Sequence, residues 1–354
     1  MPAAPPSDPA LEARLRRCAA DALGAEVTRI EWLVGQLGMR RFARLRLSGD
    51  GPRSIVARIE AAEDPAGRPA GSAPEPPLEP IRALLEARGL PVPKRYGGDR
   101  AAGIELLEDV GSEPLRDAAV RAEPALRVAL YEEACDLVPR IQAIEPAGIE
   151  AFERRLDDAL LAYKGEIFAT EALAARGRAA SAAEIDCVRQ AFARVAEQIR
   201  DAPARLAHRD FQSANLHLRA GAAPGNRLVM IDLQGAFLAP PEYDLVCLLR
   251  DSYVELPDAE LSHHLERIRP RLPDAPDAES FALRFDLLTL TRKGKDLGRF
   301  LYAFRARDDR RFLSSVPATV RALRAASRRL ADRQPSFGAL AQLVAELPEQ
   351  PCDV

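Results

Sequence analysis

Several features that would place a protein in a special class are missing from this sequence. The 354-residue chain has no apolar run long enough to span a bilayer. Its first residues, MPAAPPSDPA, lack the basic segment followed by an apolar segment that marks a secretory signal. The net charge is only −3, which offers no electrostatic basis for binding nucleic acid or an anionic membrane surface. We therefore expect a cytoplasmic protein that has neither nucleic acid nor a membrane as its partner.

Cysteine frameworks are missing as well. The five cysteines are odd in number, and no two of them form a C-x-x-C pair. A disulfide scaffold and a zinc site of the usual spacing are thereby excluded, and unpaired thiols in a reducing compartment are expected. What is present is an ordinary globular composition, 47% hydrophobic and 29% charged, long enough for two lobes with their own cores. The sequence carries no indication of an oligomeric state.

The first third of the chain predicts a small sheet with helices. A helix capped by Asp8 is expected first, and strands follow in VTRIEWLV, RRFARLRL, SIVARIE and GIELLEDVG. Residues 61–78 are rich in Pro, Gly and Ala and predict a loop, and EPIRALLEARGL predicts a short helix after it. We expect residues 1–112 to form an N-terminal lobe that holds a nucleotide.

The remaining residues, 113–354, predict a mainly helical lobe. Helical spacing of Ala, Leu and Ile covers 123–143, 150–176 and 181–200, and returns from 242 onward. The helical pattern is interrupted by LAHRDFQSANLHL and RLVMIDL, which predict a loop, a short strand and an apolar strand. We therefore expect the catalytic residues to lie in this non-helical segment.

The interruption contains the pattern H-R-D-x-x-x-x-N, from His208 to Asn215. Phosphoryl transfer needs a carboxylate beside the attacking hydroxyl, and Asp210 suits the role of catalytic base. It also needs Mg²⁺, which hard oxygen ligands bind, and the amide of Asn215 can supply one. Asp232 ends the apolar strand, where a hairpin would return it beside the loop as the main metal ligand. Gln234, in D-L-Q, is a further polar contact there.

The expected sheet also offers candidate contacts for ATP. Gly35 and Gly38, in GQLGMRRF, would form a turn over the phosphates, although an ordinary hairpin turn explains them equally well. The third strand carries Arg58 where a lysine would be expected, and arginine is not geometrically equivalent. A salt-bridged strand residue is the other interpretation of Arg58.

Two further nucleotide contacts are expected from chain order. The acidic partner of Arg58 would be Glu79 or Glu86, on the EPIRALLEAR helix. ELLEDVG would be the hinge between the lobes, where backbone groups from Leu106 through Glu108 to Asp109 hold the adenine edge. ATP and Mg²⁺ are thus the expected cofactors.

These motifs resemble the aminoglycoside phosphotransferase/choline kinase-like family over nearly the whole chain. The resemblance is strongest in 206–253, through LAHRDFQSANL, VMIDLQGA and PPEYDLVCLLRDSYVELP. Within that family the chain is similar to bacterial kinases that phosphorylate the anomeric hydroxyl of N-acetylmuramate and N-acetylglucosamine in cell-wall (peptidoglycan) recycling. The HRDF loop, the Gln after the metal acid and FDLLTLTRKGKDLGRFLYAF carry that similarity. It implies Asp210 as base and Asn215 and Asp232 as metal ligands.

Other polar residues receive supporting or substrate roles. Asp244 is expected to accept hydrogen bonds from catalytic-loop N–H groups, and His208 to order the loop. Arg250 and Asp251 would face the acceptor, or form an ion pair between helices. Lys293, Lys295 and Arg299 recur at helical spacing, which fits an anionic substrate or a solvated face equally well.

The expectation is a bilobal α+β, protein kinase-like fold with an antiparallel-sheet N-lobe and a mainly helical C-lobe. Its activity would be ATP-dependent phosphorylation of a small molecule, with an amino sugar at its anomeric hydroxyl as acceptor. One alternative keeps the chemistry and takes an aminoglycoside, a choline-like amine or another small alcohol. The other alternative is a nucleotide-binding pseudokinase-like module, which the missing lysine and the thin glycine loop would favour.

Overall fold

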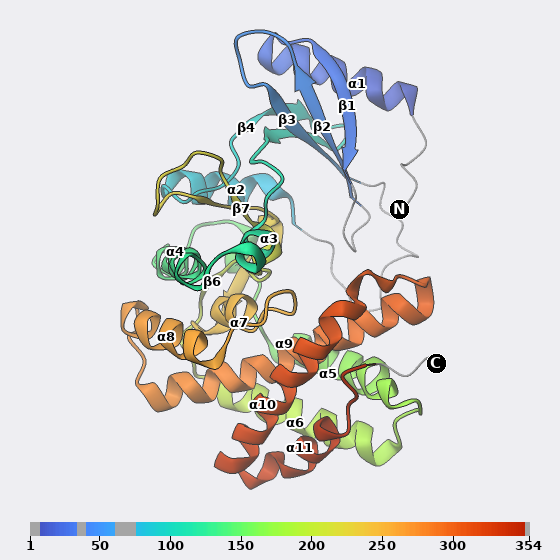
Figure 1. Cartoon of the computed structure of the whole chain (residues 1–354), viewed down its shortest axis with the longest axis vertical. Helices are drawn as coiled ribbons and strands as arrows, with labels where there is room; N and C mark the ends of the chain where they lie inside the picture. The colour runs from blue at the N-terminus through green and yellow to red at the C-terminus, as the bar shows by residue number, and fades with distance from the viewer. Residues whose placement is uncertain (1–7, 34–39, 61–75, 351–354) are drawn as a thin grey trace. The chain divides into compact units, whose positions relative to one another are not determined.

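The computed structural model describes residues 8–33, 40–60 and 76–350 and is shown in Figure 1. The described chain divides into two compact units. Residues up to 60 and 91–112 form the first unit, and residues 76–90 and 113–350 form the second. The helix predicted at 79–90 therefore belongs by its packing to the second unit. The predicted lobe boundary after residue 112 otherwise stays a prediction.

The first unit is a five-stranded antiparallel sheet with one helix packed on it (Figure 1). Helix α1 begins where the Asp8 carboxylate accepts hydrogen bonds from two backbone N–H groups, and it ends at Gly24 in the left-handed conformation. Its apolar face, with Leu15 and Ala19, buries itself against Ala43, Leu45 and their neighbours on the sheet. The elements are α1 (Pro9–Leu23), β1 (Val27–Leu33), β2 (Arg41–Leu47), β3 (Ser54–Ile59), β4 (Arg95–Asp99) and β5 (Ile104–Glu108), and the strand order is β1-β2-β3-β5-β4.

Four of these strands coincide with the predicted ones, and β4 was not predicted. Its sequence, RYGGD, has the glycines of a turn and no apolar alternation. Tertiary packing explains the glycine at 98, because a Cβ there would lie 2.1 Å from the carbonyl oxygen of Ile104 on the adjacent strand. Close approach to β5 thus requires a residue that sequence reasoning assigns to a loop.

The second unit is mainly helical, with two short antiparallel hairpin-like sheets that carry the non-helical motifs. Helix α2 packs near residues 233–235 of this unit. Its helices are α2 (Leu78–Ala87), α3 (Leu115–Arg121), α4 (Pro124–Gln142), α5 (Asp158–Ile167), α6 (Ala182–Ile199), α7 (Tyr243–Leu249), α8 (Asp258–Ile268), α9 (Ala278–Arg307), α10 (Val316–Arg333) and α11 (Gly338–Ala345). Its strands are β6 (Arg205–Ala207), β7 (Leu216–Leu218), β8 (Leu228–Met230) and β9 (Phe237–Ala239).

Helix α9 is the central element of the helical unit and runs between α5, α7 and α10. Its small residues allow the close contact with the chain that follows α5. A Cβ at Gly298 would lie 2.7 Å from the carbonyl oxygen of Ile167, and one at Gly294 would lie 3.1 Å from the Phe168 ring. This packing holds the middle of α9, with its run of charged residues, in one position.

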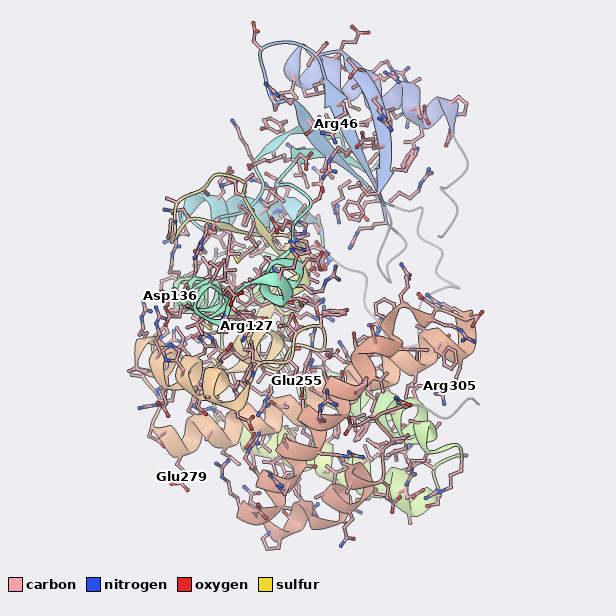
Figure 2. All side chains as sticks on the ribbon, in the orientation of Figure 1. Arg46, Arg127, Asp136, Glu255, Glu279 and Arg305 are labelled. Atoms are coloured by element: carbon pink, nitrogen blue, oxygen red, sulfur yellow. The ribbon has the colours of Figure 1, made fainter. Side chains whose placement is uncertain are left out.

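Ion pairs join elements at the surface of the second unit, as between α4 and α8. There Arg127 pairs with Glu260 at 2.5 Å, and Asp136 pairs with Arg267 at 2.7 Å (Figure 2). Among the described residues, none of the four cysteines forms a disulfide, and no helix is long and apolar enough to cross a membrane.

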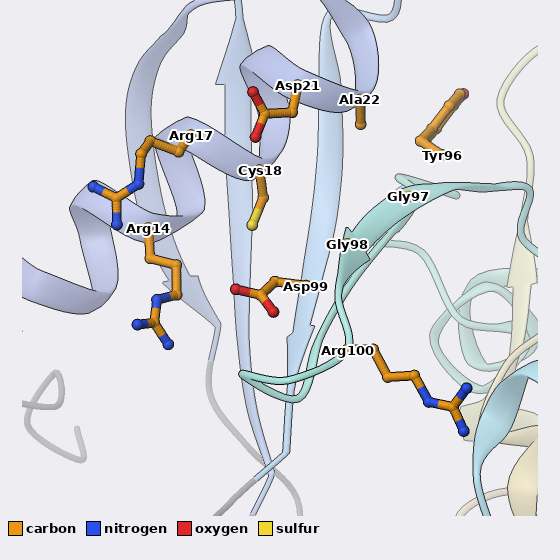
Figure 3. Close-up of a pocket in the computed structure, with 10 residues that line it drawn as sticks. All are labelled: Arg14, Arg17, Cys18, Asp21, Ala22, Tyr96, Gly97, Gly98, Asp99 and Arg100. Atoms are coloured by element: carbon orange, nitrogen blue, oxygen red, sulfur yellow. The ribbon is translucent and has the colours of Figure 1, made fainter.

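A polar pocket of about 580 Å³ opens in the first unit between α1 and β4 (Figure 3). Its lining residues are Arg14, Arg17, Cys18, Asp21, Ala22, Tyr96, Gly97, Gly98, Asp99 and Arg100. None of the predicted site residues is among them.

Candidate active site

The candidate catalytic loop, which begins at His208, follows β6, and β6 pairs with β9. Asp244 on α7 holds this loop through hydrogen bonds. The Asp244 carboxylate accepts hydrogen bonds from the backbone N–H groups of His208 at 2.7 Å and Arg209 at 3.0 Å. Asp244 is only 2% exposed, and burial raises its pKa. Its position is the one predicted from the sequence, and it satisfies two donors that the turning chain would otherwise leave unpaired.

The peptide that precedes Asp210 has an unusual conformation that other elements stabilise. Arg209 has a φ of 78°, in the left-handed region that residues with a Cβ rarely occupy. Its N–H is bonded to Asp244, and its carbonyl oxygen accepts hydrogen bonds from Arg292 Nη1 at 3.0 Å and Cys247 Sγ at 3.2 Å. The surrounding side chains thus fix both ends of this residue, and with it the direction in which Asp210 leaves the chain.

Asp210 lies between Arg292 on α9 and Gly235 after the β7–β8 hairpin. Its Oδ1 forms an ion pair with Arg292 Nη2 at 2.9 Å, while its Oδ2 lies on the side of Gly235. Burial by itself would raise the pKa of Asp210, but the positive charges of Arg292, Lys295 and Arg209 outweigh it and hold the pKa below its usual range. A third of the Asp210 side chain is exposed, so an ionised carboxylate faces the space where a reacting hydroxyl could lie.

Asn215 and Asp232 lie at the same end of the β7–β8 hairpin. Leu216 pairs with Met230 in this hairpin, and the N–H of Ile231 donates to the carbonyl oxygen of Asn215 at 3.0 Å. Asn215 Nδ2 donates to the carbonyl oxygen of Asp210 at 2.8 Å. The hairpin return predicted for Asp232 is therefore present in the structure.

The donor set at this end of the hairpin fits Mg²⁺. Because the Asn215 amide nitrogen is used by the loop, its oxygen is directed elsewhere and can serve a metal. Asp232 is exposed, has a φ of 63°, and accepts a hydrogen bond on Oδ1 from Gln234 Nε2 at 2.6 Å. One amide and one carboxylate, with water and phosphate oxygens, are the usual magnesium ligands beside a nucleotide. Among described residues, no cluster of three His, Cys, Asp or Glu side chains could hold a metal.

His208 and Asp251 both support the loop in this structure. His208 Nε2 contacts the carbonyl oxygen of Ile231 at 3.0 Å, which ties the loop to the strand before Asp232. Asp251 is buried, and it accepts hydrogen bonds from the N–H and hydroxyl of Ser213 and from the N–H of Tyr253. Burial raises its pKa. This geometry favours a structural role for Asp251, and its predicted contact with substrate stays a prediction.

The environment of Arg250 also differs from the expected one. Burial lowers its pKa, and the charged groups that act on it are Arg329, Asp286, Asp258 and Glu255. None of them belongs to the catalytic loop or to the hairpin. Both interpretations of Arg250, contact with the acceptor and an ion pair between helices, therefore stay predictions.

The nucleotide contacts predicted in the first unit are placed only in part. Gly35 and Gly38 lie outside the described residues. Arg58 is buried and pairs with Glu105 at 2.7 Å and Glu60 at 2.6 Å. Its charge is thus offset within the sheet, which agrees with the salt-bridged interpretation.

Glu79, a predicted acidic partner of Arg58, lies in α2. Leu106 and Glu108, which are predicted to contact the adenine, lie in β5. Glu79 pairs with Arg82 one turn along α2, at 2.8 Å. Leu106 lies in β5, which has hydrogen-bonded neighbours on both sides, and Glu108 is the last residue of that strand. Leu106 is paired on both sides of β5, with Ala57 and with Gly97, and the predicted adenine contact from Leu106 to Asp109 stays a prediction.

Sequence reasoning missed the most important charged contact of the site. It singled out Lys293, Lys295 and Arg299 on α9 but not Arg292, which contacts Asp210 directly. Only Arg299 is on a solvated face, whereas Lys293 is buried and Lys295 is 15% exposed. The signal that could have found this cluster is R-K-G-K-D inside a long apolar helix, because buried charges need partners.

Sequence comparisons place the chain beside known phosphotransferases. A sequence model of the phosphotransferase enzyme family matches residues 40–279. An N-acetylmuramate/N-acetylglucosamine kinase of Pseudomonas aeruginosa is 27% identical over 279 residues, 77% of this chain and 78% of the relative. The corresponding kinase of Caulobacter vibrioides is 30% identical over 180 residues, 48% of this chain and 47% of the relative.

Solved structures extend the likeness to the fold. Choline kinase LicA from Streptococcus pneumoniae aligns with a TM-score of 0.57 at 18% identity, over 91% of this chain and 99% of that chain. ADP-bound aminoglycoside phosphotransferase APH(2'')-Ib aligns with a TM-score of 0.56 at 12% identity, over 90% and 97%. Because the family match covers more than half of its length, this chain belongs to the phosphotransferase enzyme family and is a phosphotransferase.

Proposed function

We propose that this kinase transfers the γ-phosphate of ATP to the anomeric hydroxyl of an N-acetylated amino sugar. Asp210 would orient the attacking hydroxyl and accept its proton. Asn215 and Asp232 would hold Mg²⁺, which when bound neutralises the phosphate charge that develops during transfer. The observation that carries the proposal is the single frame formed by the loop and the hairpin, in which Asn215 bonds the Asp210 carbonyl and shares a hairpin end with Asp232.

The charges around Asp210 support an amino sugar over a cationic acceptor. The charged groups that act most strongly on its carboxylate are three cations, Arg292, Lys295 and Arg209. The acids nearest to them are engaged: Asp296 pairs with α9 cations, and Asp244 with backbone N–H groups. An aminoglycoside or a choline-like amine would therefore meet repulsion there, whereas a neutral or anionic sugar would not. The two N-acetylmuramate/N-acetylglucosamine kinases that are 27% identical to this chain support the same acceptor.

The pseudokinase-like alternative has less support. It relied on the missing lysine and the thin glycine loop. Within the described residues, however, the catalytic loop and hairpin retain the base, the amide and the acid in a connected frame. A binding module has no use for an ionised carboxylate held at the reacting position.

The experiment is ADP release from ATP and Mg²⁺ with N-acetylmuramate, N-acetylglucosamine, glucose, kanamycin and choline as acceptors. We expect turnover with the two amino sugars and a loss of about 10²–10⁴-fold in Asp210→Asn, the usual contribution of a general base. Turnover only with kanamycin or choline would replace the amino sugar by a cationic acceptor. ATP binding without turnover on any acceptor would favour the binding module.

A further inference from the structure

Arg292, on α9, uses all three nitrogens of its guanidinium around the candidate base. Nη2 pairs with Asp210 Oδ1 at 2.9 Å, Nη1 donates to the carbonyl oxygen of Arg209 at 3.0 Å, and Nε donates to Asp296 Oδ2 at 3.2 Å. Its side chain is only 5% exposed. One rigid group therefore bonds both the carboxylate of Asp210 and the peptide in front of it.

Arg292 is itself held by a chain of buried polar contacts. Asp296 accepts Lys293 Nζ at 3.0 Å on the oxygen that binds Arg292, and Lys295 Nζ lies 2.9 Å from its other oxygen. Lys293 Nζ also donates to Ser252 Oγ, which accepts from Thr319 Oγ1 on α10. A guanidinium supported in this way cannot change its direction without breaking several buried bonds.

The two carboxylate oxygens of Asp210 therefore have different hydrogen-bonding environments. Oδ1 is engaged by Arg292, whereas Oδ2, on the side of Gly235, makes no hydrogen bond or ion pair with any residue that the structure describes. Since Gly235 follows Asp232 in the chain, Oδ2 faces the segment of the candidate metal ligand. Oδ2 is therefore the Asp210 oxygen that is left available to an acceptor hydroxyl.

We propose that Arg292 is a positioning residue for phosphoryl transfer, which clamps Asp210 Oδ1 and the Arg209 carbonyl so that Oδ2 alone meets the acceptor hydroxyl. The inference rests on the proposed role of Asp210 as base. Arginine is required because its planar fork serves two acceptors at once, which the single ammonium of lysine does not. A carboxylate that rotates away from the reacting geometry would lower kcat more than substrate affinity, because positioning acts in the transition state.

The test compares Arg292→Ala with Arg284→Ala, a matched control on the same helix. Arg284 forms an ion pair with both oxygens of the buried Glu242, at 2.8 Å at the shortest, and no contact that the structure gives it involves the loop or the hairpin. We expect Arg292→Ala to lose about 10²-fold in kcat, the cost of a misplaced catalytic group. Its KM for ATP should stay within about threefold, because the variant loses no contact with the nucleotide.

Added guanidinium should restore at least part of kcat in Arg292→Ala, and Arg292→Lys should remain impaired. Arg284→Ala should keep kcat and show no rescue.

Crystal structures of both variants give a readout that needs no acceptor. We expect Asp210 or the Arg209 peptide to change orientation in Arg292→Ala and not in Arg284→Ala. An unchanged Asp210 together with an unchanged kcat would overturn the proposal, and so would equal losses in both variants without rescue. If the wild type transfers phosphate to none of the acceptors, the proposed function fails, while the crystallographic comparison still decides whether Arg292 positions Asp210.

Discussion

At the scale of one residue, Lys295 shows how burial among other cations lowers the pKa of an ammonium group and opposes folding. Its ammonium pairs with Asp296 at 2.9 Å, and its side chain is 15% exposed. Burial, followed by the repulsion of Arg292, lowers the pKa of Lys295 to about 8. The folded protein therefore prefers the neutral amine more than the unfolded chain does, and charging Lys295 below pH 8 opposes folding.

We predict a pH-dependent stability difference between Lys295→Met and the wild type. The stability that Lys295 contributes is present above its unfolded pKa, near 10.4, and is lost as the pH falls through about 8. The unfolding free energy of Lys295→Met minus that of the wild type should therefore be about 3 kcal/mol larger at pH 7 than at pH 10.5, at about 1.4 kcal/mol per pKa unit. Urea unfolding at the two pH values measures it. A difference that does not change with pH would show that Lys295 is not perturbed by its neighbours.

At the scale of elements, the β7–β8 hairpin is anchored at the end opposite to Asn215 and Asp232. Glu133, on α4, accepts hydrogen bonds from the backbone N–H groups of Gly225, Arg227 and Leu228 and from Arg227 Nε. Its side chain is 8% exposed. One carboxylate thus satisfies three backbone donors of the turn and holds the hairpin against α4.

We predict that Glu133→Ala destabilises the protein by about 1–3 kcal/mol, because three backbone donors, two of them partly buried, lose a charged acceptor. It should also raise the KM for MgATP, since the candidate metal ligands lie on the same hairpin. Glu132→Ala is the matched control: its neighbouring carboxylate is 31% exposed and pairs with His263 and Arg267, so about 0–1 kcal/mol is expected. Chemical unfolding and nucleotide titration measure both quantities. Equal effects in the two variants would contradict an anchoring role.

The position of α9 depends on its close contact with the segment after α5. We predict that Gly298→Ala destabilises the protein by about 1–3 kcal/mol, the usual cost of overpacking, because the new methyl would lie 2.7 Å from the Ile167 carbonyl oxygen. Gly338→Ala, at the start of α11, meets no atom within 4 Å and should be neutral or stabilising by up to about 1 kcal/mol. Thermal unfolding distinguishes the two. A stable Gly298→Ala would mean that α9 can shift without cost.

At the scale of the whole molecule, binding of MgATP should stabilise the folded chain. A ligand that binds only the folded protein adds about 2.7 kcal/mol at a hundred times its Kd. We predict that ATP with Mg²⁺ raises the unfolding midpoint by several degrees, that EDTA removes most of this shift, and that Asp232→Asn shows only the EDTA value. Asp210→Asn should keep the full shift because it removes the base and not a metal ligand. A shift in the wild type that is the same with and without Mg²⁺ would exclude Asp232 as a metal ligand.

The sequence by itself determined the fold class and predicted the residues of the candidate site. His208, Asp210, Asn215, Asp232 and Asp244 could be proposed together because short chain segments join most of them, and a loop and hairpin bring those together by local geometry. Four strands of the first unit were predictable from their apolar alternation. Strand β4 was not, because its glycines serve a close tertiary contact that has no local signature.

Only the tertiary structure decided which residues surround the base. Arg292 lies 83 residues after Arg209, and it reaches the loop because α9 packs through glycines against the chain after α5. The hydrophobic effect is non-directional. The apolar periodicity of a helix therefore does not reveal which charged side chains of that helix will face a loop that is distant in the sequence. Tertiary packing also gave Asp251 its partner Ser213 in the second unit, and sheet pairing in the first unit gave Arg58 its partner Glu105. Local motifs thus specify the candidate reacting groups, whereas long-range packing specifies their orientation and the charges around them.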